Sequence, residues 1–159
     1  DERDPWILRG GWVAAYNKRH LGYGVHRCMS AGGSANMGFS GSGLTLYGET
    51  TPDAGICEVH LNGELVATVD LYSGRPNREF VIYKNDSLKQ GFHSISLRAT
   101  GRANVMSSGT WVALDGITVR YQAVDDDNEL FADLTTLYLD ANASYGRDTI
   151  GQAQSGTAK

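Results

Sequence analysis

The sequence predicts an all-β sandwich followed by a C-terminal extension of different character. Short segments rich in β-branched and aromatic residues alternate between apolar and polar positions, as half-buried strands do. Helical periodicity is absent between Trp12 and Tyr121. Glycine fills 20 of 159 positions, well above the usual ~7%, which implies many tight turns. A chain of this length suits one hydrophobic core.

Each expected strand follows from a local run of this kind. In the segment 56–62, Cys57, Val59 and Leu61 share one face, and the polar residues between them share the other. This alternation predicts one face toward the core and one toward water. The expected strands are 35–40, 44–48, 56–62, 65–72, 79–83, 93–100 and 110–120.

The connections between these strands fall into two kinds. Three are short and contain glycine, as hairpin turns require: 40–43, 62–63 and 89–91. Three are longer and chemically richer: 49–54, 73–78 and 101–109. If successive strands run antiparallel, all the long connections meet at one end of the sandwich, where such folds usually carry binding residues.

The segment after Tyr121 differs in charge and pattern. Residues 1–120 carry 12 Lys and Arg against 11 Asp and Glu, whereas residues 121–159 carry 2 against 7. An Asp-rich stretch at 125–128 precedes apolar residues at helical spacing over 130–141, which favours a helix, although 135–139 also fits a strand. We expect a lead-in at 1–10, a sandwich at 11–121 and an acidic extension or linker at 122–159.

Composition excludes several classes of protein. No apolar run approaches the ~20 residues that span a bilayer, and no basic stripe suits nucleic acid. The first residues contain neither a starting Met nor a signal-peptide pattern, so we expect a piece of a longer polypeptide. Cys28 and Cys57 form no zinc motif, which leaves two buried thiols or a single bridge between them.

Four segments carry a resemblance to a known family. The chain reads FSGSGLTLYG at 39–48, VHLNGELVATVDLYS at 59–73, GFHSI at 91–95 and SSGTWVALDG at 107–116. In order and spacing they resemble the galactose-binding-like jelly-roll module attached to glycoside hydrolases, carbohydrate esterases and some phage tail proteins. The likeness covers about 11–121, including Gly11-Trp12 and Val25-His26. Two features depart from it: Cys57 occupies a small inward position, and 122–159 has no counterpart.

The resemblance implies a jelly-roll fold, a polysaccharide or glycoconjugate as partner, and a place outside the cell, on its surface or on a virion. It also implies a structural Ca²⁺ in some members, for which Asp115 on the last strand is the first candidate, although no calcium-loop spacing accompanies it. No other cofactor is expected.

Motifs of catalysis are missing from the sequence. The segment 38–42 fails the nucleophile-elbow pattern at its last position, and no glycine run matches a phosphate loop. Glu49 and Asp53 could form the carboxylate pair of a glycosidase, but loop carboxylates are usually solvated. We therefore expect a domain that is not itself an enzyme.

Sugar binding requires aromatic rings beside planar hydrogen-bonding groups, because a pyranose presents C–H faces and paired hydroxyls. Candidates on the long connections are Glu49, Asp53, Arg75, Asn77, Arg102 and Asn104, with Tyr72 and Trp111 beside them and Tyr16, Tyr23 and His26 from the first segments. Structural roles compete with this interpretation: Trp111 could pack, His26 could be a satisfied structural residue, the arginines could pair with acids, and Asp70 could accept hydrogen bonds from loop amides.

Three hypotheses follow. The chain is a non-catalytic carbohydrate-binding module that targets a larger protein, or a structural or adhesion domain whose residues 128–141 join copies into a homo-oligomer. Alternatively, it is the accessory half of a carbohydrate esterase or hydrolase whose catalytic domain lies outside this sequence.

Overall fold

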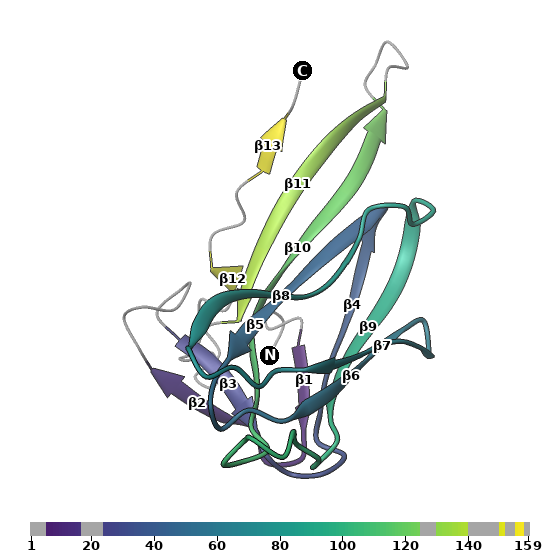
Figure 1. Cartoon of the computed structure of the whole chain (residues 1–159). Coiled ribbons are helices and arrows are strands. Elements are labelled where there is room, and N and C mark those ends of the chain that lie inside the picture. Colours follow the sequence, from purple (N-terminus) through teal and green to yellow (C-terminus); the bar gives the residue numbers. More distant parts are fainter. Residues whose placement is uncertain (1–5, 17–23, 125–129, 140–149, 152–154, 158–159) are drawn as a thin grey trace.

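Two antiparallel β-sheets face each other in the computed structural model, and the fold is a jelly-roll β-sandwich (Figure 1). The structure describes residues 6–16, 24–124, 130–139, 150–151 and 155–157. Every regular element in these ranges is a strand. No helix in the described part of the chain is long and apolar enough to cross a lipid bilayer.

The five-stranded sheet has the order β1-β4-β9-β6-β7. Its strands are β1 (Trp6–Arg9), β4 (Ser34–Gly41), β9 (Gly91–Ala99), β6 (Ile56–Leu61) and β7 (Glu64–Asp70). The range 1–10, expected as a lead-in, thus contributes an edge strand. Trp6 on this strand is buried in the core.

The eight-stranded sheet is built around β10 (Val112–Val124). One side of β10 pairs with β5 (Gly43–Thr50), which pairs with β8 (Asn77–Asn85). β10 also pairs with β3 (Gly24–Cys28) near its start and with β11 (Leu130–Leu139) further along. The remaining strands are β2 (Val13–Tyr16) beside β3, and β12 (Ile150–Gly151) and β13 (Ser155–Thr157) beside β11.

The seven strands expected from the sequence are all present, and β1, β2 and β3 were missed because they are short. The helix expected over 130–141 is wrong for residues 130–139, which form β11. Its backbone pairs antiparallel with Gly116–Val124 of β10. The end of β10 extends beyond the sandwich, and β11 forms hydrogen bonds with it there (Figure 1). Residues 140 and 141 lie outside the described residues.

Only one of the three short connections is a hairpin. Asn62 and Gly63 join β6 to β7 with positive φ angles of 52° and 82°, as a type I′ turn requires. The other two short connections, 40–43 and 89–91, instead carry the chain between sheets. Successive strands there belong to opposite sheets, as in a jelly roll, so the predicted hairpins are wrong at both places.

The core lies between the sheets. Cys57, Val59 and Leu61 are buried, as the alternation of β6 predicted. On the neighbouring strand β7, Leu65 is exposed because a bulge shifts the register between β6 and β7. Both cysteines are free and buried. The largest fully buried apolar side chains are Leu44, Leu46, Leu71, Ile95, Leu97, Leu114, Ile117, Val25, Val59 and Val112.

Candidate functional site

The three long connections, 49–54, 73–78 and 101–109, meet at one end of the sandwich and form what is here called the rim. The amide of Thr51 donates to Leu71 O at 3.1 Å, and the amide of Ser73 donates to Thr51 O at 3.1 Å. The amide of Ser108 donates to Pro52 O at 3.0 Å, and Ser107 Oγ donates to Ala54 O at 2.7 Å. The predicted gathering of the long connections is therefore confirmed.

The short connections occupy the opposite end. The amide of Leu88 donates to Ser42 O at 3.0 Å, and the amide of Ser42 donates to Arg120 O at 2.6 Å. In Figure 1 the green segment of 101–109 lies at the bottom, below β6. The chemically varied connections and the glycine-bearing ones are thus separated by the length of the sheets.

Arg27 organises one side of the rim, and the sequence did not single it out. Its Nη2 donates to Asp53 Oδ1 at 2.9 Å, and its guanidinium carbon lies 4.8 Å from the centre of the Trp111 ring. Thr51 Oγ1 donates to the same Asp53 oxygen at 2.6 Å. Asp53 and Trp111, both predicted to contact sugar, are therefore held by partners within the protein.

The carboxyl groups of Asp53 and Glu49 respond in opposite ways to these surroundings. Burial alone would raise the pKa of Asp53, but hydrogen bonds from Thr51 and Arg27 outweigh burial and lower its pKa. Burial dominates at Glu49 and raises its pKa, against the attraction of Arg27 and Arg78. Glu49 is buried on β5, where it pairs with Ala113 of β10.

Asp70, Tyr72 and Asn104 form a second group at the rim, and it faces solvent. Asn104 Nδ2 donates to Asp70 Oδ2 at 2.9 Å, and the Tyr72 amide donates to Asp70 Oδ1 at 2.9 Å. Asn104 Oδ1 in turn accepts from the Met106 amide at 2.9 Å. The expectation that Asp70 accepts from a loop amide is confirmed. These bonds fix the planes of a carboxylate and a carboxamide at the surface.

The remaining polar candidates of the long connections are exposed. Arg75 and Ser73 exchange hydrogen bonds within their own loop, with Ser73 Oγ donating to Arg75 O at 2.7 Å. Asn77, the first residue of β8, accepts from the Glu79 amide at 3.1 Å through its Oδ1. The backbone of Arg102 accepts from the Ile56 amide at 2.8 Å, which ties its loop to β6.

Of the candidates from the first segments, His26 lies apart from this exposed group. His26 is buried on β3, opposite Leu114 of β10. Tyr16 ends β2, where its backbone pairs with Gly24, and Tyr23 lies outside the described residues. The structure thus brings Asp53 and Trp111 together through Arg27. It also brings Asn104 into contact with Asp70, two residues before Tyr72.

Asp115, the candidate for calcium, is fully buried where β10 bulges between Leu114 and Gly116. Among the described residues, no three or more His, Cys, Asp and Glu side chains are grouped as a metal site would require. Calcium prefers several oxygen ligands with carboxylates among them, and backbone carbonyls can complete such a set. The calcium site stays a prediction.

Comparison with known proteins finds one similar sequence and several solved structures of similar fold. No family model matches the chain. Over 88 residues, 55% of this chain, it is 31% identical to an A type blood alpha-D-galactosamine galactosaminidase from Flavonifractor plautii, and it spans 8% of that protein. The chain therefore corresponds to a small part of this relative.

Two solved structures share the fold. A xanthan lyase from Paenibacillus superposes with a TM-score of 0.53 at 15% identity, over 85% of this chain and 17% of the lyase. A two-domain esterase active on acetylated mannans, co-crystallized with mannopentaose, superposes with a TM-score of 0.54 at 13% identity, over 73% of this chain and 34% of the esterase. The chain has the fold of a domain within larger carbohydrate-active proteins.

Proposed function

We propose that this chain is a non-catalytic carbohydrate-binding domain that holds a larger carbohydrate-active protein close to a polysaccharide or glycoconjugate. The observation that carries the proposal is the exposed Asp70–Asn104 pair beside Tyr72. Neighbouring hydroxyls of a pyranose take hydrogen bonds from planar carboxylate and amide groups, and groups already fixed in place lose little entropy on binding. Arg75, Asn77 and Arg102 supply further exposed donors and acceptors on the same connections.

The state of the two rim acids supports a binding role over a catalytic one. A glycosidase needs one carboxyl group as a proton donor and another beside the scissile bond. Glu49 is buried within the eight-stranded sheet, and Asp53 is engaged by Arg27 and Thr51. Neither group is free to approach a glycosidic oxygen in this arrangement.

The ligand class is proposed from the relatives. One of them acts on galactosamine-bearing glycans, and the structurally similar esterase acts on acetylated mannans. We therefore expect a hexose or hexosamine, with or without acetyl groups, to bind at the rim. Binding at a single small site is expected to be weak, and tethering to a larger protein raises its effective strength.

A glycan array followed by calorimetry tests the proposal. The array includes galactosamine-bearing and mannan oligosaccharides, and each glycan that binds is titrated into the wild type and into Asn104→Ala. We expect the variant to bind about tenfold more weakly, because it loses hydrogen bonds from Asn104 worth ~1 kcal/mol each and also the bond that orients the Asp70 carboxylate. Lys84→Ala, an exposed change on β8, is the matched control and should bind as the wild type does. A folded wild type that binds no glycan contradicts the proposal.

A further inference from the structure

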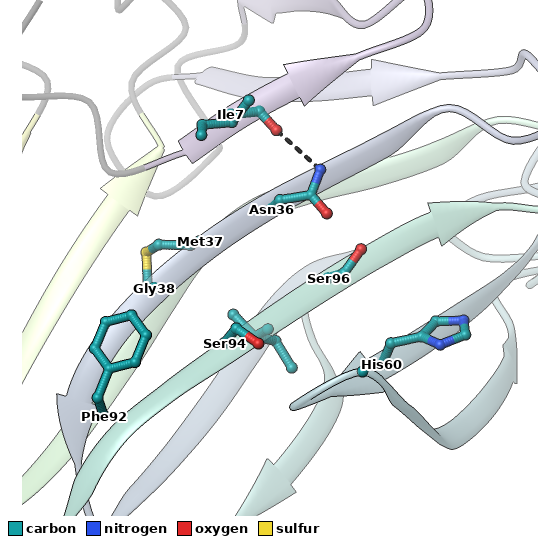
Figure 2. A pocket seen from close by; sticks show the side chains of 10 residues that line it. Ile7, Asn36, Met37, Gly38, His60, Phe92, Ser94 and Ser96 are labelled. Atoms are coloured by element: carbon teal, nitrogen blue, oxygen red, sulfur yellow. Dashed lines mark hydrogen bonds between the residues drawn. The ribbon is translucent and has the colours of Figure 1, made fainter.

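A groove of about 380 Å³ lies on the outer face of the five-stranded sheet, on strands β1, β4, β9 and β6 (Figure 2). It is separate from the rim, because it includes Gly63 of the short β6–β7 turn and none of the long connections.

The register of the sheet explains why a depression forms there. Ile7, Asn36, Ser96 and His60 are paired directly in one row across the four strands, so their side chains share one face. Asn36 and Ser96 in the middle of this row are smaller than Ile7 and His60 at its ends. The row spans three gaps between strands of ~4.8 Å, or roughly 14 Å, which exceeds the width of one sugar ring.

Phe92 provides an apolar platform beside the row. Its side chain is 76% exposed, which is high for a large apolar residue on a strand. The ring lies over Gly38, since a Cβ added to Gly38 would come within 2.7 Å of Phe92 Cζ (Figure 2). Aromatic rings exposed beside polar groups are suited to the C–H faces of sugars.

The polar groups of the groove carry little charge. Within the described part of the chain, no carboxylate, Lys or Arg lines it. His60 is its single titratable side chain there, and His60 Nε2 contacts Glu58 Oε2 at 3.1 Å. Asn36 Nδ2 donates to Ile7 O at 3.3 Å and to Ser34 Oγ at 3.0 Å, which fixes the plane of its amide.

We infer that this groove binds an internal stretch of a neutral polysaccharide chain, as a second site independent of the rim. The absence of lining charge favours a neutral ligand over an acidic or basic one. The length of the row favours several consecutive sugar units over a single terminal unit. The Phe92 ring would contact the apolar face of one unit, and the Asn36, Ser94 and Ser96 side chains would exchange hydrogen bonds with hydroxyls of its neighbours. The choice of a saccharide as ligand rests on the proposed function.

The test is affinity gel electrophoresis of the whole chain through galactomannan, glucomannan, xylan and, as an acidic comparison, pectin. Phe92→Ala removes the platform, and Gly38→Ala pushes the ring from its place while leaving Phe92 intact. Val81→Ala on β8 is the matched control, because it trims an exposed apolar side chain on the other sheet. Phe92 and Gly38 are both exposed, so circular dichroism should show each variant folded.

We expect retardation by at least one neutral polysaccharide to weaken about tenfold in Phe92→Ala, to weaken in Gly38→Ala and to persist in Val81→Ala. In the rim variant Asn104→Ala, retardation by the polymer should largely persist, while binding of short oligosaccharides falls. Retardation that is the same in Phe92→Ala and Val81→Ala overturns the groove assignment and leaves the proposed function standing. Failure of every glycan to bind overturns both. If Phe92→Ala instead lowers the mass measured by light scattering, the face joins copies of this chain and the saccharide assignment is wrong.

Discussion

At the scale of single residues, the rim contains two carboxylates whose burial and partners differ. Asp53 is stabilised in its charged form by Thr51 and Arg27, whereas burial destabilises the charged form of Glu49. The unfolded chain titrates near the ordinary values of ~3.9 for Asp and ~4.3 for Glu. The two groups should therefore make opposite contributions to the pH dependence of stability.

For Asp53, the folded pKa lies below the unfolded one, so its contribution to stability is present above about pH 4 and is lost as pH falls through the folded pKa. We expect Asp53→Asn to lower the free energy of unfolding at pH 7 by about 1 kcal/mol, since the pair is partly exposed and screened. The deficit should shrink toward pH 3. Urea unfolding at pH 7, 4 and 3 measures it, and a deficit that is independent of pH would contradict this account.

For Glu49, the folded pKa lies above the unfolded one, so the wild type loses stability as pH rises through this interval. Glu49→Gln removes the charge and keeps the shape. The difference in free energy of unfolding, variant minus wild type, should therefore rise as pH increases from 4 to 7. For Asp53→Asn the same difference should fall as pH increases. The two isosteric variants serve as controls for each other in the same urea series, and slopes of equal sign would refute the assignment.

At the scale of the elements, turn chemistry and sheet register decide different things. The Asn-Gly turn between β6 and β7 is a local choice, because both residues must adopt positive φ. The connections at 40–43 and 89–91 resemble turns of the same kind in composition, yet they pass from one sheet to the other. Local glycine content therefore predicts where the chain bends, and the partner strand decides what the bend joins.

We expect Gly63→Ala to destabilise the fold by about 1 kcal/mol, although no atom lies within 4 Å of the added Cβ. The cost comes from its φ of 82°, which L-residues other than Asn and Asp adopt with strain. Gly74→Ala is the matched control, because Gly74 has similar open space and no positive φ. Thermal or urea unfolding compares them; equal stability of the two variants would remove the backbone explanation.

At the scale of the whole molecule, the two thiols report on the integrity of the sandwich. Cys57 is fully buried, and burial raises its pKa to about 12. Cys28 is also fully buried, and burial raises its pKa while its Sγ donates to Gly10 O at 3.0 Å. Both therefore lack the exposed thiolate that reacts with disulfide reagents.

We expect neither thiol to react with a disulfide reagent in the native state, and both to become reactive together across the urea transition. The reason is that each side chain lies in the core shared by the two sheets. Labelling followed by mass spectrometry measures the two sites separately. Rapid labelling of Cys57 without denaturant would show that the sandwich opens locally at β6.

Association between copies stays a prediction at this scale. The apolar residues of 128–141 led us to expect a homo-oligomer, and in the structure part of this range forms β11 beside β10. Light scattering of the full chain over a range of concentrations decides the question. A constant monomer mass would remove association through this segment.

The sequence by itself determined the all-β class, seven strands and the gathering of the long connections at one end, because side-chain alternation and glycine turns are local signals. It also identified Asn104, Asp53 and Trp111 as rim residues. Arg27 was missed because its partners, Asp53 and Trp111, are distant from it in the sequence. The pairing of β3 with β10 brings Arg27 beside Trp111, and the backbone contact between Trp111 and Asp53 adds the third residue. The tertiary structure alone decided that 130–139 is a strand and that Ile7, Asn36, Ser96 and His60 line one groove. Both outcomes depend on which strand pairs with which, and register between distant segments is set by the packed sheets as a whole.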